Sequence, residues 1–205
     1  MQIVNFIKDS TIECSPFTWG LTLFSYGCNF RCKMCRGYNY EKVSDKNNII
    51  GNAIDIIKEN ITPLHDCVVF LGGEPTIWGE KLRQALLYCR EIGVHTKIFS
   101  NGFLSDTIES INNEHLCDAW SIDFKGLNNI YEEFGIQASD YLINVNYSIN
   151  DIIRSGLPLE IRTTFYSGNN KWRDDITNYV EKNFLEKDTS GLVKYIRQED
   201  VRDLL

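Results

Sequence analysis

Short apolar runs alternate with helical periods along this chain of 205 residues. Runs bounded by glycine or polar turns predict strands that are buried on both faces. Between the runs, apolar residues recur at helical spacing, as Ile54, Ile57 and Ile61 do, and Thr76 and Gly93 are candidates for the two ends of one helix. The predicted strands are 20–26, 67–71, 96–99, 119–124 and 159–165, and the predicted helices are 52–60, 77–92, 106–111, 141–155 and 174–184.

The alternation of strand and helix indicates an α/β fold with a parallel sheet joined by right-handed crossovers. Five or six β/α units predict an incomplete TIM-like barrel. We expect one domain over 1–205, with a core at about 3–166 and a C-terminal helical extension at 167–205. Ligands of such sheets bind at the carboxyl ends of the strands, so the loops there are expected to carry the chemistry.

Composition narrows the class of partner. The formal net charge of −7 disfavours non-specific binding to nucleic acid. The longest apolar runs, such as 67–71, are far shorter than a membrane span. The chain holds seven cysteines, and its N-terminal sequence lacks the pattern of a signal peptide. We therefore expect a cytoplasmic protein with neither a membrane nor a nucleic acid as its partner.

Three cysteines, Cys28, Cys32 and Cys35, stand within eight residues after the first predicted strand. Thiolates at this spacing can converge on one iron–sulfur cluster, and three ligands leave one of the four irons of a cubane open for a substrate. Zinc is an alternative, but the nearest histidine, His65, lies outside the usual finger spacings. A disulfide would need an oxidising compartment. The dispersed cysteines are interpreted as core residues, and they are Cys14, Cys67, Cys89 and Cys117.

Each of the other predicted strands also ends near polar or glycine residues. These candidates are Gly72, Gly73 and Glu74 after the second strand, Ser100 and Asn101 after the third, Asp123 and Lys125 at the fourth, and Arg162 in the fifth. Paired glycines let a ligand approach the backbone, but an ordinary turn uses them too, as it does Asn101-Gly102. Asp123 and Lys125 could hold a zwitterionic ligand or form a simple ion pair. Arg162 is costly to bury without an anion, and clamping a carboxylate is one natural use.

Taken together, Cys28-x3-Cys32-x2-Cys35 and Gly72-Gly73-Glu74-Pro75 resemble the radical S-adenosylmethionine superfamily, over about residues 3–166. Segments such as Leu71–Thr76 and Ile122–Lys125 are similar in order and spacing to the activating proteins of anaerobic ribonucleotide reductases. The resemblance implies a partial (β/α)6 barrel with the radical SAM fold. It also implies one [4Fe–4S] cluster on Cys28, Cys32 and Cys35, with S-adenosylmethionine chelating the open iron through its amino and carboxylate groups.

The resemblance further implies contacts to the cofactor. The backbone of Gly72, Gly73 and Glu74 would meet the methionyl amino group, and Met34 would lie beside the adenine. The ribose and carboxylate would be surrounded by Ser100, Asn101, Asp123, Lys125 and Arg162. No catalytic side chain beyond the cluster and cofactor is implied. The chain departs from the family pattern at Phe99, which replaces a frequent aspartate, and at Glu13-Cys14-Ser15-Pro16, which replaces an Asp-Gly/Tyr-Pro-Gly segment.

The function that the resemblance implies is that of an activase for a glycyl radical enzyme. Reductive cleavage of S-adenosylmethionine would give a 5′-deoxyadenosyl radical, which would abstract hydrogen from a glycine of an anaerobic ribonucleoside-triphosphate reductase. Flavodoxin or ferredoxin would donate the electron. The alternatives are a small-molecule enzyme such as a 7-carboxy-7-deazaguanine synthase, and a non-enzymatic electron carrier. The synthase is disfavoured because Arg36-Gly37 stands where a Cys-Asp-Thr-like sequence would follow Cys35.

Overall fold

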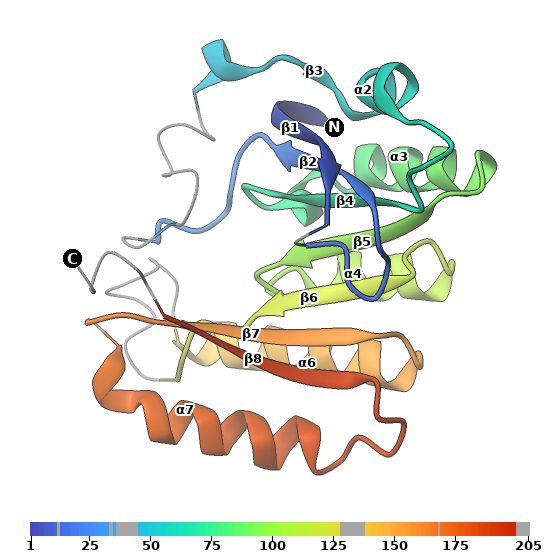
Figure 1. The fold of residues 1–205 in the computed structure, drawn as a ribbon. Coiled ribbons are helices and arrows are strands. Elements are labelled where there is room, and N and C mark those ends of the chain that lie inside the picture. The colour runs from blue at the N-terminus through green and yellow to red at the C-terminus, as the bar shows by residue number, and fades with distance from the viewer. Residues whose placement is uncertain (12, 33–34, 36–44, 128–137, 168, 200–205) are drawn as a thin grey trace.

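The computed structural model describes residues 1–11, 13–32, 35, 45–127, 138–167 and 169–199 (Figure 1). Six strands of its sheet run parallel, and they are β2 (Gly20–Ser25), β4 (Cys67–Gly72), β5 (His95–Ser100), β6 (Ala119–Asp123), β7 (Leu159–Phe165) and β8 (Val193–Glu199). They are neighbours in chain order. This series of parallel strands confirms the predicted α/β fold and is consistent with a partial TIM barrel.

Two further strands extend the sheet beyond β2. β1 (Gln2–Ser10) pairs antiparallel with β2, and β3 (Gly51–Asn52) pairs antiparallel with β1. The sequence pattern did not predict β1, because its pairing with β2 shifts register twice, between Ile3 and Asn5 and between Ile7 and Ser10. Such bulges interrupt the alternation of apolar and polar residues that marks a strand.

Within the described residues, each predicted helix has a counterpart near its expected place. They are α2 (Ala53–Asn60), α3 (Glu80–Glu91), α4 (Ser105–Asn113), α6 (Ala138–Arg154) and α7 (Arg173–Val180). The predicted start at residue 77 is wrong, because Pro75–Trp78 forms a 3-10 turn and Gly79, with φ of 43°, precedes α3. Thr76 therefore does not cap α3. No helix in the described part of the chain has the length and apolar character needed to cross a membrane.

The C-terminal segment is not only helical, which corrects the prediction for 167–205. It contains α7 and a π-helix at Glu181–Leu185, and it then returns to the sheet as β8. β8 pairs with β7 over seven residues and supplies the sixth parallel strand. Its alternating intermediate and exposed residues lack a continuous apolar run, so the pattern for a doubly buried strand did not detect it.

The two faces of the sheet differ in character. Trp120 and Ile122 of β6 belong to the main apolar core, whereas Asp123 lines a cavity on the other face. At the N-terminal ends of β4 and β5, this second face is covered by residues 13–19, which we call the β1–β2 loop. Phe17 of the loop stacks on His95 with ring centroids 4.7 Å apart, and the Ser15 carbonyl accepts a hydrogen bond from Lys97 Nζ at 2.6 Å. The opposite, carboxyl ends of the strands remain for a site.

Candidate functional site

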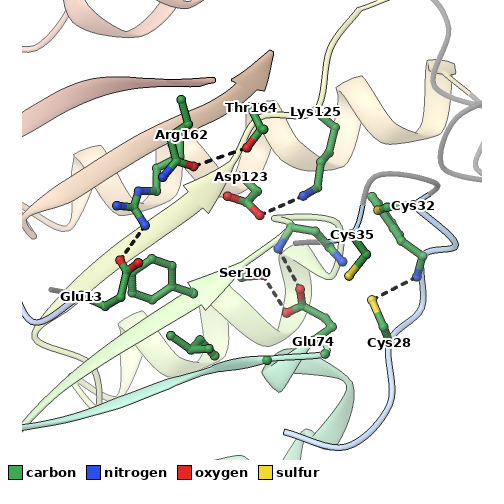
Figure 2. A pocket seen from close by; sticks show the side chains of 17 residues that line it. Glu13, Cys28, Cys32, Cys35, Glu74, Ser100, Asp123, Lys125, Arg162 and Thr164 are labelled. Carbon is green, nitrogen blue, oxygen red and sulfur yellow. Dashed lines mark hydrogen bonds and ion pairs between the residues drawn. The ribbon is translucent and has the colours of Figure 1, made fainter. Parts of the chain in front are cut away.

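A cavity of about 280 Å³ lies at the carboxyl ends of the parallel strands (Figure 2). It brings together the site residues predicted from the sequence with one exception. Those lining it are Cys28, Cys32, Cys35, Gly72, Gly73, Glu74, Ser100, Asn101, Asp123, Lys125 and Arg162. The exception, Met34, lies outside the described residues. Strands far apart in sequence converge here because the carboxyl ends of parallel strands share one edge of the sheet.

The cysteines occupy one end of the cavity, and Arg162 and Glu13 occupy the other (Figure 2). The cysteine loop is anchored by Phe30, which is buried and packs edge-on against Phe103 with ring centroids 5.7 Å apart. The Phe30 amide donates a hydrogen bond to Cys28 Sγ at 3.4 Å. Burial, reinforced by the nearby Glu74, raises the pKa of the Cys28 thiol to about 12. The thiolate therefore needs a cation beside it, as a metal ligand has.

No set of three histidine, cysteine, aspartate or glutamate side chains is arranged for a metal ion in the described residues. Cys28, Cys32 and Cys35 nevertheless face one cavity from one loop. Soft thiolate donors in this number, converging on a space larger than one ion, fit an iron–sulfur cluster.

The Glu74 carboxylate is the most thoroughly bonded group in the cavity, although the sequence pointed only to its backbone. It is 2% exposed. It accepts hydrogen bonds from the Thr76 amide at 3.1 Å, the Thr76 hydroxyl at 2.6 Å, the Ser100 hydroxyl at 2.9 Å and the Asn101 amide at 2.7 Å. Burial raises its pKa, while these donors oppose that rise. Glu74 thereby ties the loop after β4 to the loop after β5.

The paired glycines serve a close contact with the start of the cysteine loop. A Cβ atom on Gly73 would lie 1.8 Å from the Gly27 carbonyl oxygen, and one on Gly72 would lie 2.5 Å from the Ser25 amide nitrogen. The Gly73 amide donates to the Ser25 carbonyl at 3.0 Å, and the Glu74 amide donates to the Gly27 carbonyl at 2.8 Å. A ligand amino group donates its hydrogens, so at this loop it would be received by carbonyl oxygens.

Asp123 and Lys125 form an ion pair at the cavity wall, with Lys125 Nζ 2.8 Å from Asp123 Oδ2. The Lys125 amide donates to the Tyr141 hydroxyl at 2.5 Å, which fixes the chain after β6. Burial would lower the pKa of the Lys125 ammonium, but Asp123 and Cys32 outweigh burial and raise that pKa above its usual value. Both charges line the cavity, so the pair offers a cation and an anion to a ligand.

Arg162 has an anionic partner inside the chain that the sequence did not predict. Its Nη1 lies 2.7 Å from Glu13 Oε2, and the two side chains are 13% and 29% exposed. Its guanidinium also lies 5.0 Å from the centroid of the Phe99 ring, a cation–π contact. Glu13 and Arg162 are 149 positions apart in the chain. The sequence pointed to Glu13 only through the departure from the family pattern at residues 13–16.

Comparison with known proteins identifies the superfamily of this chain. Residues 22–174 match the model of the Radical SAM superfamily, and the chain therefore belongs to that superfamily. Its members are enzymes that use a [4Fe–4S] cluster and S-adenosylmethionine, and the cysteine end of the cavity provides suitable ligands for the cluster.

Among curated relatives, the chain is similar to "Putative glycyl-radical enzyme activating enzyme MJ1227" of Methanocaldococcus jannaschii, with 28% identity over 168 residues. That match covers 80% of this chain and 68% of the relative. The chain is also 27% identical over 163 residues to the 4-hydroxyphenylacetate decarboxylase activating enzyme of Clostridioides difficile, covering 77% of this chain and 51% of that protein.

Solved structures share the fold. The structure of anSMEcpe with bound AdoMet matches with a TM-score of 0.60 at 17% identity, over 84% of this chain and 47% of that one. TYW1 with a lysine-pyruvate adduct matches with a TM-score of 0.55 at 19% identity, over 89% of this chain and 66% of that one. The present chain thus spans only part of these larger enzymes.

Proposed function

We propose that this chain is a radical SAM activase that generates a glycyl radical on a partner enzyme. The observation that carries the proposal is the cavity that three thiols share with the Gly72–Glu74 loop and with the charged residues Asp123, Lys125 and Arg162. The names of the two curated relatives support an activase over the small-molecule synthase considered above. Segments such as Leu71–Thr76 and Ile122–Lys125 resemble, in order and spacing, the activating proteins of anaerobic ribonucleotide reductases. This resemblance supports an anaerobic ribonucleoside-triphosphate reductase as the partner.

In this proposal each side of the cavity has a distinct task. Cys28, Cys32 and Cys35 hold the [4Fe–4S] cluster, which when bound supplies the electron for cleavage of S-adenosylmethionine. The carbonyls of Gly72, Gly73 and Glu74 receive the methionyl amino group. The ribose and carboxylate are held by Ser100, Asn101, Asp123, Lys125 and Arg162. Met34, outside the described residues, keeps its proposed place beside the adenine.

An open flank supports a macromolecular substrate. The sheet is not closed into a full barrel, since β8 pairs only with β7 among the described strands. An extended loop of a partner can enter such a gap, and the partner then completes the exclusion of water. Flavodoxin or ferredoxin as electron donor and a cytoplasmic location also belong to this proposal.

Electron paramagnetic resonance tests the activase. The reconstituted protein, a chemical reductant and S-adenosylmethionine are incubated with an anaerobic ribonucleoside-triphosphate reductase, and a glycyl doublet on the reductase is expected. A reductase whose radical glycine is replaced by alanine is the control. A doublet on 4-hydroxyphenylacetate decarboxylase but not on the reductase would show that the partner is assigned wrongly, and the activase function would stand. Turnover of a free small molecule with no protein radical would overturn the activase.

Arg162 is expected to contribute to cofactor affinity. Arg162→Ala should weaken binding of S-adenosylmethionine by about 2 kcal/mol, roughly thirtyfold, because it removes a charge-assisted hydrogen bond and leaves Glu13 uncompensated. Lys125→Ala should cost less, since an ammonium is less directional than a guanidinium. Equilibrium dialysis of the cluster-loaded protein measures both. If the Arg162 variant retains the cluster and binds S-adenosylmethionine with unchanged affinity, the role of Arg162 is confined to its ion pair with Glu13.

A further inference from the structure

Cys14 and Cys67 form a buried pair of thiols outside the cofactor site. Cys14 belongs to the β1–β2 loop, Cys67 is the first residue of β4, and both are 0% exposed. A Cβ atom built on Gly20 would lie 2.6 Å from Cys14 Sγ and 2.7 Å from Cys67 Sγ, so the two sulfur atoms are neighbours around one point. The absence of a side chain on Gly20 provides the room that the two sulfurs occupy.

The two thiols also influence each other. Cys14 Sγ donates a hydrogen bond to the Ser10 carbonyl at 3.0 Å. The neighbouring Cys67 lowers the pKa of Cys14 although burial opposes it, and Cys14 together with burial raises the pKa of Cys67. These directions favour Cys14 as the thiol that is oxidised first, and Cys67 lies beside it to complete a disulfide.

We propose that Cys14 and Cys67 are an oxidation site that closes to a reversible disulfide. The Cys14 thiolate attacks hydrogen peroxide, forming a sulfenic acid and releasing water once a proton is taken up. The Cys67 thiol then attacks the sulfenic sulfur and releases a second water. Overall, two thiols and one peroxide give one disulfide and two waters, so the peroxide is the oxidant and no other reagent is needed.

The disulfide would fix the β1–β2 loop to the sheet. This loop supplies the Ser15 carbonyl to Lys97 and supplies Glu13, which lines the cavity, to Arg162. A bond between residues 14 and 67 would hold the loop in the position seen here. Because both sulfurs lie within 2.7 Å of the same point beside Gly20, they are close enough for small movements to join them.

Mass spectrometry of the full chain tests the proposal. The protein is treated with a small excess of hydrogen peroxide, quenched with catalase, alkylated in denaturant and digested without reductant. A dithiothreitol-sensitive peptide joining Cys14 to Cys67 is expected in most molecules. Cys89 and Cys117, which are similarly buried, should be recovered alkylated and serve as internal controls. Recovery of Cys14 and Cys67 as alkylated thiols, or a link of either to a cysteine of the cluster loop, would overturn it.

A second measurement uses the Cys67→Ser variant. Peroxide should raise the thermal midpoint of the wild-type chain by several degrees, because the cross-link constrains the unfolded state. The variant should show no such gain, and its Cys14 should be captured by dimedone as a sulfenic acid. An equal rise of the thermal midpoint in both proteins would contradict a disulfide between Cys14 and Cys67. If the variant fails to fold, the peptide map of the wild-type chain decides the question.

Discussion

Replacing Cys32 by alanine is expected to abolish the iron–sulfur cluster. Anaerobic reconstitution of the wild-type chain should give one [4Fe–4S] cluster, because one set of three clustered cysteines lines the cavity. Without Cys32 the cubane keeps only two protein ligands and leaves a second iron open, so iron and sulfide should fall from about four per chain to near zero. Iron and sulfide analysis with the visible absorption spectrum measures this change.

Cys89→Ala is the matched control for the cluster. Cys89 lies in α3, is 0% exposed and packs in the main apolar core. Its replacement should cost some stability through the lost packing but should leave the iron content at the wild-type value. A cluster that persists in Cys32→Ala, or is lost in Cys89→Ala, would show that the ligands are assigned wrongly.

Gly73→Ala is expected to have the second-largest effect. A methyl group at residue 73 would overlap the Gly27 carbonyl group and lie 3.0 Å from the Ser25 carbonyl oxygen, and these backbone atoms cannot rotate aside as a side chain can. Relief requires the two loops to separate, which breaks the hydrogen bonds from the Gly73 and Glu74 amides. Two lost bonds at about 1 kcal/mol each, together with steric strain, should lower the free energy of unfolding by at least about 3 kcal/mol. Urea denaturation measures the loss.

The same substitution should also displace the cysteines, since Gly27 directly precedes Cys28. Poor retention of the cluster and weak binding of S-adenosylmethionine are expected at temperatures where the variant is folded. Gly51→Ala is the control, because its new Cβ would meet only the end of the Ile56 side chain at 3.4 Å. That change should alter stability by less than about 1 kcal/mol. Equal losses in the two variants would contradict the steric argument.

Local pattern was sufficient for much of the fold. Five of the six parallel strands were predicted because residues such as Leu21, Val68 and Ile98 lie in runs buried on both faces. β8 was missed because its exposed positions, such as Lys194 and Arg197, interrupt any such run. β1 was missed because its bulges break the alternation. Strands were predicted where consecutive residues are buried, and they were missed where exposed residues or bulges interrupt the pattern.

The sequence alone determined the superfamily and most of the cavity. The spacing of Cys28, Cys32 and Cys35 is local, and parallel strands necessarily bring their carboxyl ends together, so Ser100, Asp123 and their neighbours could be placed in one site. Only the tertiary structure decided that the Glu74 carboxylate joins two loops, that Glu13 pairs with Arg162, and that Cys14 meets Cys67. These contacts join separate segments of the chain, and pairing across such distances leaves no periodic trace in the sequence from which it could be read.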